Sequence, residues 1–128
     1  MSMTDAGEKS TDGTARLQTG ECTIEGRQFV ITLLLFTNGC FVSISEDSKH
    51  RLGAITLSVK SAGRAISSSL IPESKGSMLA NMIGELLAEA LRGMAIISLY
   101  LRSEVGAADM KTLISEVRKM LEKVDALV

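Results

Sequence analysis

The stretch QFVITLLLFTNGCFVSIS, residues 28–45, decides the fold of this chain. Two runs rich in β-branched and aromatic residues flank the dipeptide Asn38-Gly39. Asn-Gly between such runs is the strongest short-range signal for a β-hairpin, because a type I′ turn requires positive φ at both of its central residues. The stretch therefore predicts two antiparallel strands joined by a type I′ turn at Asn38-Gly39.

Further strands are predicted on both sides of this hairpin. Residues 46–51, EDSKHR, are polar and predict a loop that leaves it. Pro72 ends the last strand before the helices, since proline cannot donate a hydrogen bond to a strand ladder. Four more segments have the composition and alternation typical of strands: residues 20–25, 52–60, 66–71 and 94–102.

Two amphipathic helices follow from apolar residues that recur with a period of 3.6. The first spans Met78 to Leu91, with Ser77 as its expected N-cap and Gly93 as its stop. The second begins near Ala107. Five strands, a helix, a strand and a helix predict an α+β fold, in which both helices cover one face of a six-stranded antiparallel sheet. The apolar residues of the second helix are Met110, Leu113, Ile114, Val117, Leu121 and Val124.

A stripe of small side chains runs along the first helix at Ala80, Gly84 and Ala88. A glycine inside a helix lowers stability by about 1 kcal/mol relative to alanine. Close packing of another backbone against the stripe would explain why a glycine stands there.

The second face of the sheet is also apolar. In residues 28–37 and 94–102, the apolar side chains occupy both faces of the strand. A chain of this length has nothing left to cover the second face, and an exposed apolar patch typically marks an interface. We therefore expect a partner to pack on the sheet, unless these are central strands with a mildly apolar exposed side. The expected interface residues are Val30, Leu34, Phe36, Met94, Ile96 and Tyr100.

Composition bounds the class of protein. The chain has 128 residues, of which 45% are apolar, and this predicts one globular domain with an aliphatic core. Fourteen basic and fifteen acidic residues give a net charge of −1, which argues against binding to nucleic acid or to an anionic membrane. The longest apolar run, Phe29 to Phe36, is far shorter than the roughly 20 residues of a membrane helix.

The N-terminal segment, residues 1–20, has too few apolar residues to offset the entropy of ordering it. We expect a disordered tail there, followed by a single domain over residues 21–128. The segment lacks the apolar core of a signal peptide. Cys22 and Cys40 have no metal-ligand spacing and are expected to be reduced, so the sequence predicts a cytoplasmic or nuclear protein.

No residue pattern predicts catalysis, a cofactor or a metal, so we expect a protein that is not an enzyme. His50 could act as a base for Cys40, but nothing in the spacing supports such a pair, and an ordinary exposed loop histidine is the favoured interpretation. Glu85 and Glu89 share a helix face, which is typical of a solvated surface. Lys75-Gly76-Ser77 could hold a phosphate at a helix N-terminus, but capping by Ser77 explains the same residues.

The order of these elements resembles a known family. The succession GCFVSIS, LGAITLSV, ISSSLI, SMLANMIGELLAEAL and AIISLYL, within Gly39 to Leu121, is similar to the small proteasome assembly chaperones of the third and fourth types, and most similar to the fourth. The resemblance implies a sheet with two helices that pairs through the sheet with a second chaperone, as a homodimer or heterodimer. It also implies binding to α subunits of the 20S proteasome during assembly of the α-ring.

One feature departs from part of that family. Some proteasome chaperones end in a hydrophobic-Tyr-any tail, whereas this sequence ends in Ala126-Leu127-Val128, so we expect binding through the folded surface. The alternative is an adaptor scaffold of the roadblock or longin type, used in trafficking or GTPase regulation. Those folds usually place a helix before or early among the strands, and five strands before the first helix count against them.

Overall fold

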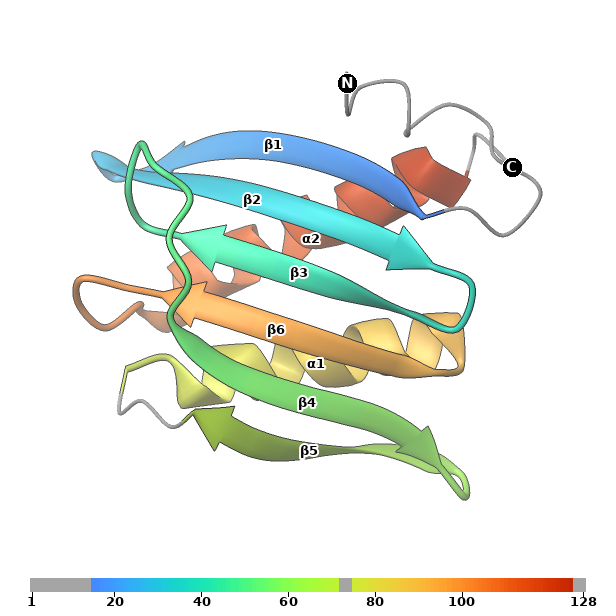
Figure 1. Ribbon diagram of the computed structural model, residues 1–128. Helices are drawn as coiled ribbons and strands as arrows, with labels where there is room; N and C mark the ends of the chain where they lie inside the picture. Colours follow the sequence, from blue (N-terminus) through green and yellow to red (C-terminus); the bar gives the residue numbers. More distant parts are fainter. Residues whose placement is uncertain (1–14, 72–74, 126–128) are drawn as a thin grey trace.

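The computed structural model describes residues 15–71 and 75–125. Within these residues the chain forms six strands and two helices, which confirms the predicted α+β class (Figure 1). In chain order they are β1 (Arg16–Ile24), β2 (Arg27–Phe36), β3 (Gly39–Ser45), β4 (Ala54–Ser61), β5 (Arg64–Ile71), α1 (Ser77–Leu91), β6 (Met94–Tyr100) and α2 (Ala107–Asp125).

The strands form one sheet in the order β1-β2-β3-β6-β4-β5. All neighbouring pairs are antiparallel except β3 and β6, which run parallel with Val42 opposite Ile97. The predicted antiparallel sheet is therefore confirmed at every pair except this one, which is parallel. A hairpin forces reversal of the chain, but β6 is reached through α1, so no turn fixes its direction.

The hairpin predicted at residues 28–45 forms, but its turn differs from the predicted one. The loop residues are Thr37 and Asn38, and Gly39 is the first residue of β3 without a positive φ. A Cβ atom on Gly39 would collide with the carbonyl oxygen of Met94. Gly39 is therefore needed for the close approach of β6 and not for a type I′ turn.

The two other hairpins do have turns with positive φ at both central residues, as type I′ requires. Glu25 and Gly26 have φ of 50° and 80° between β1 and β2. Ala62 and Gly63 have φ of 43° and 103° between β4 and β5. The right-handed twist of such turns matches that of the strands they connect.

The first strand begins earlier than predicted. β1 starts at Arg16, so residues 16–20 belong to the sheet and not to a tail. They are held by pairing with the apolar strand β2, where Leu17 lies opposite Leu34. Composition cannot predict where β1 begins, because backbone hydrogen bonds to the neighbouring strand can hold a polar segment at the edge of a sheet. The predictions for residues 1–14, Pro72 and residues 126–128 lie outside the described residues.

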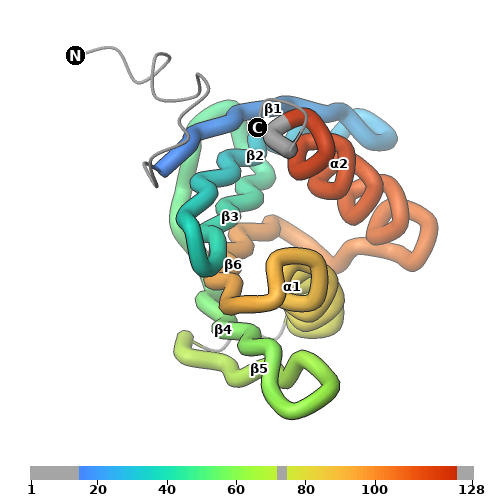
Figure 2. Tube along the Cα trace, turned by 90° about the vertical axis from the view of Figure 1, so that its right-hand side faces the viewer, coloured from blue at the N-terminus to red at the C-terminus, as the bar shows by residue number. Residues whose placement is uncertain are grey.

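Both helices lie on one face of the sheet, as predicted (Figure 2). α1 packs against β4, β6 and β5, and α2 packs against β1 and β2. The main core lies between the helices and this face, and its largest fully buried side chains are Phe29, Ile31, Leu33, Ile44, Leu79, Ile83, Leu87, Ile97, Leu99 and Leu113.

Helix α1 packs on the sheet through its stripe of small residues. Ala80 and Ala88 are 2% and 0% exposed, whereas the larger apolar residues Met78 and Met82 are 64% and 44% exposed. A Cβ atom on Gly84 would collide with the Ser58 hydroxyl and lie 3.3 Å from Ile97 Cγ1. The stripe therefore does allow close packing, although the nearest group is a side chain and not a backbone.

The ends of α1 also differ from the prediction. The N-cap is Gly76, with a left-handed φ of 75°, and no side chain caps the helix. At the other end Arg92, not Gly93, adopts the left-handed conformation, with a φ of 53°. A Cβ atom on Gly93 would collide with the carbonyl oxygen of Asn38, so this glycine serves close packing.

Replacing Gly84 with alanine is expected to lower the free energy of unfolding by about 1–3 kcal/mol, because the added methyl overpacks the contact with Ser58. The higher helix propensity of alanine, about 1 kcal/mol, opposes this loss. Urea unfolding measures the effect. In a Ser58→Ala background the same substitution should cost less, since the colliding oxygen is gone. An equal cost in both backgrounds would contradict this packing.

Candidate partner-binding surface

The face of the sheet opposite the helices carries two adjacent rows of mostly apolar residues. Strand register places Leu17, Leu34, Phe41, Ile96 and Leu57 side by side across five strands. The next row contains Phe36, Gly39, Met94, Val59 and Ile66. We call these two rows the open-face patch.

The open-face patch is accessible although it lies on central strands. Phe36 is 46% exposed, Met94 42% and Ile66 52%. Leu34, Ile96 and Leu57 are half-buried by their neighbours. No described helix covers this face, since both helices lie on the opposite one (Figure 2). The patch is thus a continuous apolar surface that the described part of the chain leaves open to solvent.

The remaining part of the open face is more polar, and the chain itself covers part of it. Residues 46–53, which we call the crossing segment, leave β3 and pass in front of the sheet to reach β4 (Figure 1). His50 Nδ1 lies 3.1 Å from Thr32 Oγ1, and Gly53 N donates to Ser98 Oγ at 3.0 Å. Ser45 Oγ donates to the carbonyl oxygen of Lys49 at 3.0 Å. Side chains of β2, β3 and β6 therefore all hold the segment.

Because the crossing segment lies over part of the open face, not all of the predicted interface residues are accessible to a partner. Val30 is 3% exposed and lies beside Ser45 at the covered end, so its prediction as an accessible interface residue is wrong. The Tyr100 ring lies under the Arg51 guanidinium, whose carbon is 5.9 Å from the ring centroid. The other four predicted residues are in the open-face patch: Leu34, Phe36, Met94 and Ile96.

The sequence prediction missed the patch residues on β1 and β3 and those on β4 and β5. The apolar side of β4, with Leu57 and Val59, faces away from the helices, while Thr56 and Ser58 are buried on the helix side at 5% and 0% exposure. The alternation of apolar and polar residues in residues 52–60 already assigns Leu57 and Val59 to one face of the strand and Thr56 and Ser58 to the other. The small-residue stripe in α1 was the missing signal, because a helix that packs so closely can cover short polar side chains.

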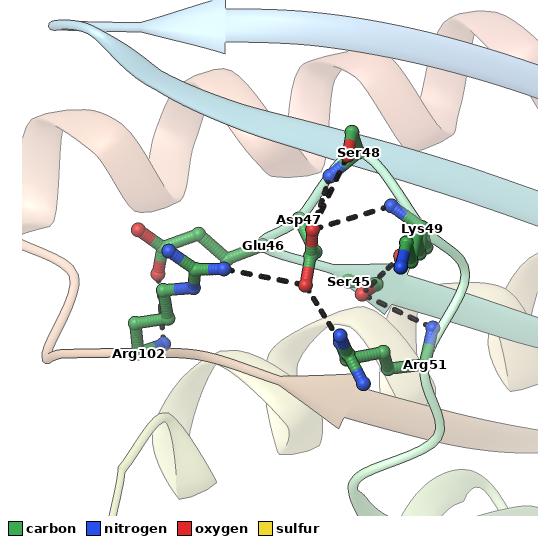
Figure 3. Close-up of polar contacts among 7 residues, drawn as sticks. All are labelled: Ser45, Glu46, Asp47, Ser48, Lys49, Arg51 and Arg102. Atoms are coloured by element: carbon green, nitrogen blue, oxygen red, sulfur yellow. Dashed lines mark hydrogen bonds and ion pairs between the residues drawn. The ribbon is translucent and has the colours of Figure 1, made fainter.

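Glu46 anchors the start of the crossing segment. Its carboxylate accepts two hydrogen bonds from Arg27, from Nη2 at 2.6 Å and from Nε at 2.8 Å. It also accepts from the backbone N–H of Arg102 at 2.9 Å (Figure 3). The bonds from Arg27 lower the pKa of Glu46 below its ordinary value, although burial opposes the shift. The same pair raises the pKa of Arg27.

Asp47 fixes the turn that follows. Its Oδ2 accepts from Arg51 Nε at 2.6 Å and from Arg102 Nη2 at 3.3 Å (Figure 3). Its Oδ1 accepts from the backbone N–H of Ser48 at 2.6 Å. The bond from Arg51 is the main reason that the pKa of Asp47 lies well below its usual range. A cavity of about 360 Å³ adjoins these residues, but both of its carboxylates are already paired with arginine.

The residues considered for catalysis do not come together. Cys40 is 4% exposed and faces the core, and burial raises the pKa of its thiol to about 12. His50 lies on the opposite face of the sheet, where it contacts Thr32, so the sheet separates the two. Within residues 15–71 and 75–125, no group of three or more His, Cys, Asp or Glu is placed to hold a metal ion.

Glu85 and Glu89 attach α1 to the sheet. Glu85 accepts a hydrogen bond from Ser67 Oγ at 2.8 Å. Glu89 accepts from Lys60 Nζ at 2.7 Å and from Ala65 N at 2.9 Å. Each carboxylate thus has its own partners on β4 or β5.

Of the helices in the described ranges, none is long and apolar enough to span a bilayer.

Replacing Glu46 with glutamine is expected to lower the free energy of unfolding by about 1–3 kcal/mol at pH 7, because charge-assisted bonds to Arg27 are lost. A lowered pKa means that Glu46 contributes stability above its unfolded pKa and loses it as the pH falls through the folded value. The difference from the unmodified protein should therefore shrink toward pH 3.

Urea unfolding at both pH values measures this dependence, with the exposed Glu122→Gln as the matched control. The control should change stability little at either pH. A Glu46→Gln cost that stays constant as the pH falls would show that the ionised pair does not hold the crossing segment.

Comparison with known proteins supports the fold. No family model matches the sequence, and no curated protein matches it. Among solved structures, the chain is similar to one from the crystal structure of a novel chaperone complex for yeast 20S proteasome assembly, with a TM-score of 0.65 and 12% sequence identity. The match covers 88% of this chain and 98% of that chain. At this identity the likeness establishes a shared fold over almost the whole of the yeast chain.

Proposed function

We propose that this protein is a non-catalytic chaperone that assists assembly of the 20S proteasome α-ring. It acts as a homodimer, or as a heterodimer with a related chaperone, and binds proteasome α subunits. The observation that carries the proposal is the open-face patch. Two rows of mostly apolar residues run across the six strands on a face that neither helix covers, and an exposed apolar surface of this kind typically marks an interface with a partner.

The shape of the patch suits another sheet as the partner. Sheets pack face to face at about 10 Å with their side chains interdigitated, and the patch offers the mixed surface of Phe, Leu, Ile and Val that such packing uses. The crossing segment stands above the polar part of the face. A partner sheet therefore lies off-centre, over the end of the sheet that carries Phe36 and Met94.

The shared fold supports the class of function. The yeast protein that the chain resembles comes from a chaperone complex for 20S proteasome assembly. Resemblance in sequence pattern over Gly39 to Leu121 points to the same family and most closely to its fourth type. We propose a cytoplasmic or nuclear location, with proteins and not nucleic acid or membrane as the partners. A formal charge of −1 agrees with this choice.

The other classes of function have less support. The buried Cys40 and the distant His50 give no nucleophile and base pair, which favours a protein that is not an enzyme. An adaptor of the roadblock or longin type usually has an early helix, whereas strands β1 to β5 all precede α1 here.

Replacing Ile96 with glutamate is expected to weaken association with the partner by at least about tenfold, because a buried unpaired charge opposes binding. Ile96 lies between Phe41 and Leu57 in the middle of the patch. Leu34→Glu should act similarly. Analytical ultracentrifugation of the chain, or of its purified heteromeric complex, measures the change. Thr19→Glu is the control on the same face; an equal loss there would show that the patch is not the interface.

Affinity purification of the tagged full-length chain from its own cells is expected to recover 20S proteasome α subunits. The recovered material should lack the complete mature particle, because an assembly chaperone leaves before assembly ends. Ile96→Glu, checked for a native circular dichroism spectrum, should reduce recovery of the chaperone partner. Recovery of an intact dimer without any α subunit would contradict the proposed role in proteasome assembly, but it would still agree with the open-face patch as the dimer interface.

A further inference from the structure

The outer edge of strand β5 lacks the charges that usually protect a sheet edge. β1 and β5 are the two edge strands of the sheet (Figure 1). Proteins commonly place charged residues or proline on such strands, because the unpaired backbone groups of an edge can pair with another chain. β1 contains Arg16 and Glu21, whereas residues 65–71 of β5 contain neither a charged residue nor proline. The edge of β5 is therefore open to pairing with a further strand.

One hydrogen bond shows which backbone groups of β5 point outward. Ala65 N donates to Glu89 Oε2 at 2.9 Å, so this N–H points away from β4. Residues of an antiparallel strand direct their N–H and C=O groups alternately to the two sides. The register with β4 is regular up to Ser69, where a bulge begins, so Ser67 and Ser69 also direct their groups outward. Among the described residues, none is bonded to these outward backbone groups of Ser67 and Ser69.

The side chains along this edge are self-complementary about Ser68. Residues 66–70 read Ile-Ser-Ser-Ser-Leu. An antiparallel copy centred on Ser68 places Ile66 of each chain opposite Leu70 of the other, and these side chains are 52% and 57% exposed. Apolar pairs directly opposite each other stabilise a sheet. The same register places Ser67 opposite Ser69, and two residues that face each other with outward groups exchange both of their N–H···O bonds.

The charges beside the edge follow the same symmetry. Glu85 accepts a hydrogen bond from Ser67 Oγ at 2.8 Å, so its carboxylate lies beside Ser67 on the helix side. Lys75 and Ser69 line the same pocket at the start of α1. A copy centred on Ser68 therefore brings each Glu85 toward Lys75 of the other chain. A copy centred on Ser67 would instead bring the two glutamates together, and one centred on Ser69 the two lysines, so the charges select Ser68.

We infer that two copies of this chain pair antiparallel through β5, about a two-fold axis at Ser68, and join their two sheets into one. A contact that uses the same residues on both copies closes on itself and gives a dimer. The short edge offers a small contact area, so the expected Kd is about 100 µM. Of the residues named in the open-face patch, only Ile66 belongs to this strand. The inference does not depend on the proposed chaperone function.

Amide hydrogen exchange in the ¹⁵N-labelled full chain, followed by NMR at about 10 µM and about 1 mM protein, tests the pairing. By mass action, a Kd of about 100 µM predicts that the amides of Ser67 and Ser69 exchange about fourfold more slowly at the higher concentration. Thr19 and Glu21 on the opposite edge strand, β1, should exchange at the same rate at both concentrations. These amides report on the edge itself, so association through the open-face patch does not imitate the result.

Two sets of variants, each checked for a native circular dichroism spectrum, test the geometry. Ser69→Pro removes an outward N–H and leaves the bonds to β4, because proline is tolerated on edge strands. It should abolish the slowing at Ser67, whereas the matched control Thr19→Pro on β1 should keep it. Lys75→Glu should weaken association at least about fivefold, since it brings two carboxylates together. Adding Glu85→Lys to that variant should restore the affinity.

Exchange at Ser67 and Ser69 that does not depend on protein concentration would overturn the inference. Persistent slowing at Ser67 in the Ser69→Pro chain would also overturn it. If these amides are slowed only when a chaperone partner or proteasome α subunits are added, the edge binds a strand of a different protein and the second copy is wrong. None of these results decides the role of the open-face patch, which has its own test.

Discussion

The parallel pairing of β6 with β3 at the centre of the sheet is the constraint on which the rest of the structure depends. It inserts β6 between β3 and β4, which are consecutive in the chain. The connection from β3 to β4 must then span two interstrand spacings, roughly 10 Å. It does so across the open face, as the crossing segment, and the glycines Gly39 and Gly93 make room for the backbone of β6 where it enters the sheet.

Two consequences follow for the open face. Ion pairs of Glu46 with Arg27 and of Asp47 with Arg51 fix the crossing segment. The segment lies over the strand positions that contain Ser45 and Ser98 and bonds to both side chains. The apolar rows beyond its reach stay accessible, and they form the open-face patch. Meanwhile the helix side of β4 is polar and lies under the small-residue stripe of α1, so its apolar side chains face the open side. The parallel insertion of β6 between β3 and β4 thus explains both the position of the crossing segment and the open-face patch beside it.

Much of this architecture can be predicted from the sequence, because local patterns carry it. Periodicity gives the strands and helices, and two-sided apolarity in residues 28–37 and 94–102 gives the central strands and four of the patch residues. Val30 could not be placed correctly, because it lies beside Ser45 where the crossing segment begins, and the path of that segment depends on the strand order. The parallel direction of β6 and the use of Gly76 instead of Ser77 as the N-cap likewise depend on tertiary contacts. The pattern of apolar and polar residues along the sequence contains no information on either.

If a partner sheet covers the open-face patch, the patch side chains lose contact with solvent when the complex forms. The most direct measurement is the accessibility of side-chain methyl groups to a soluble paramagnetic probe, by NMR, in the free chain and in the purified complex. The account predicts that Leu34, Ile96 and Leu57 lose their exposure to the probe in the complex, while the exposed Met78 on α1 keeps it. Protection of Met78 with Leu34 and Ile96 still exposed would contradict it.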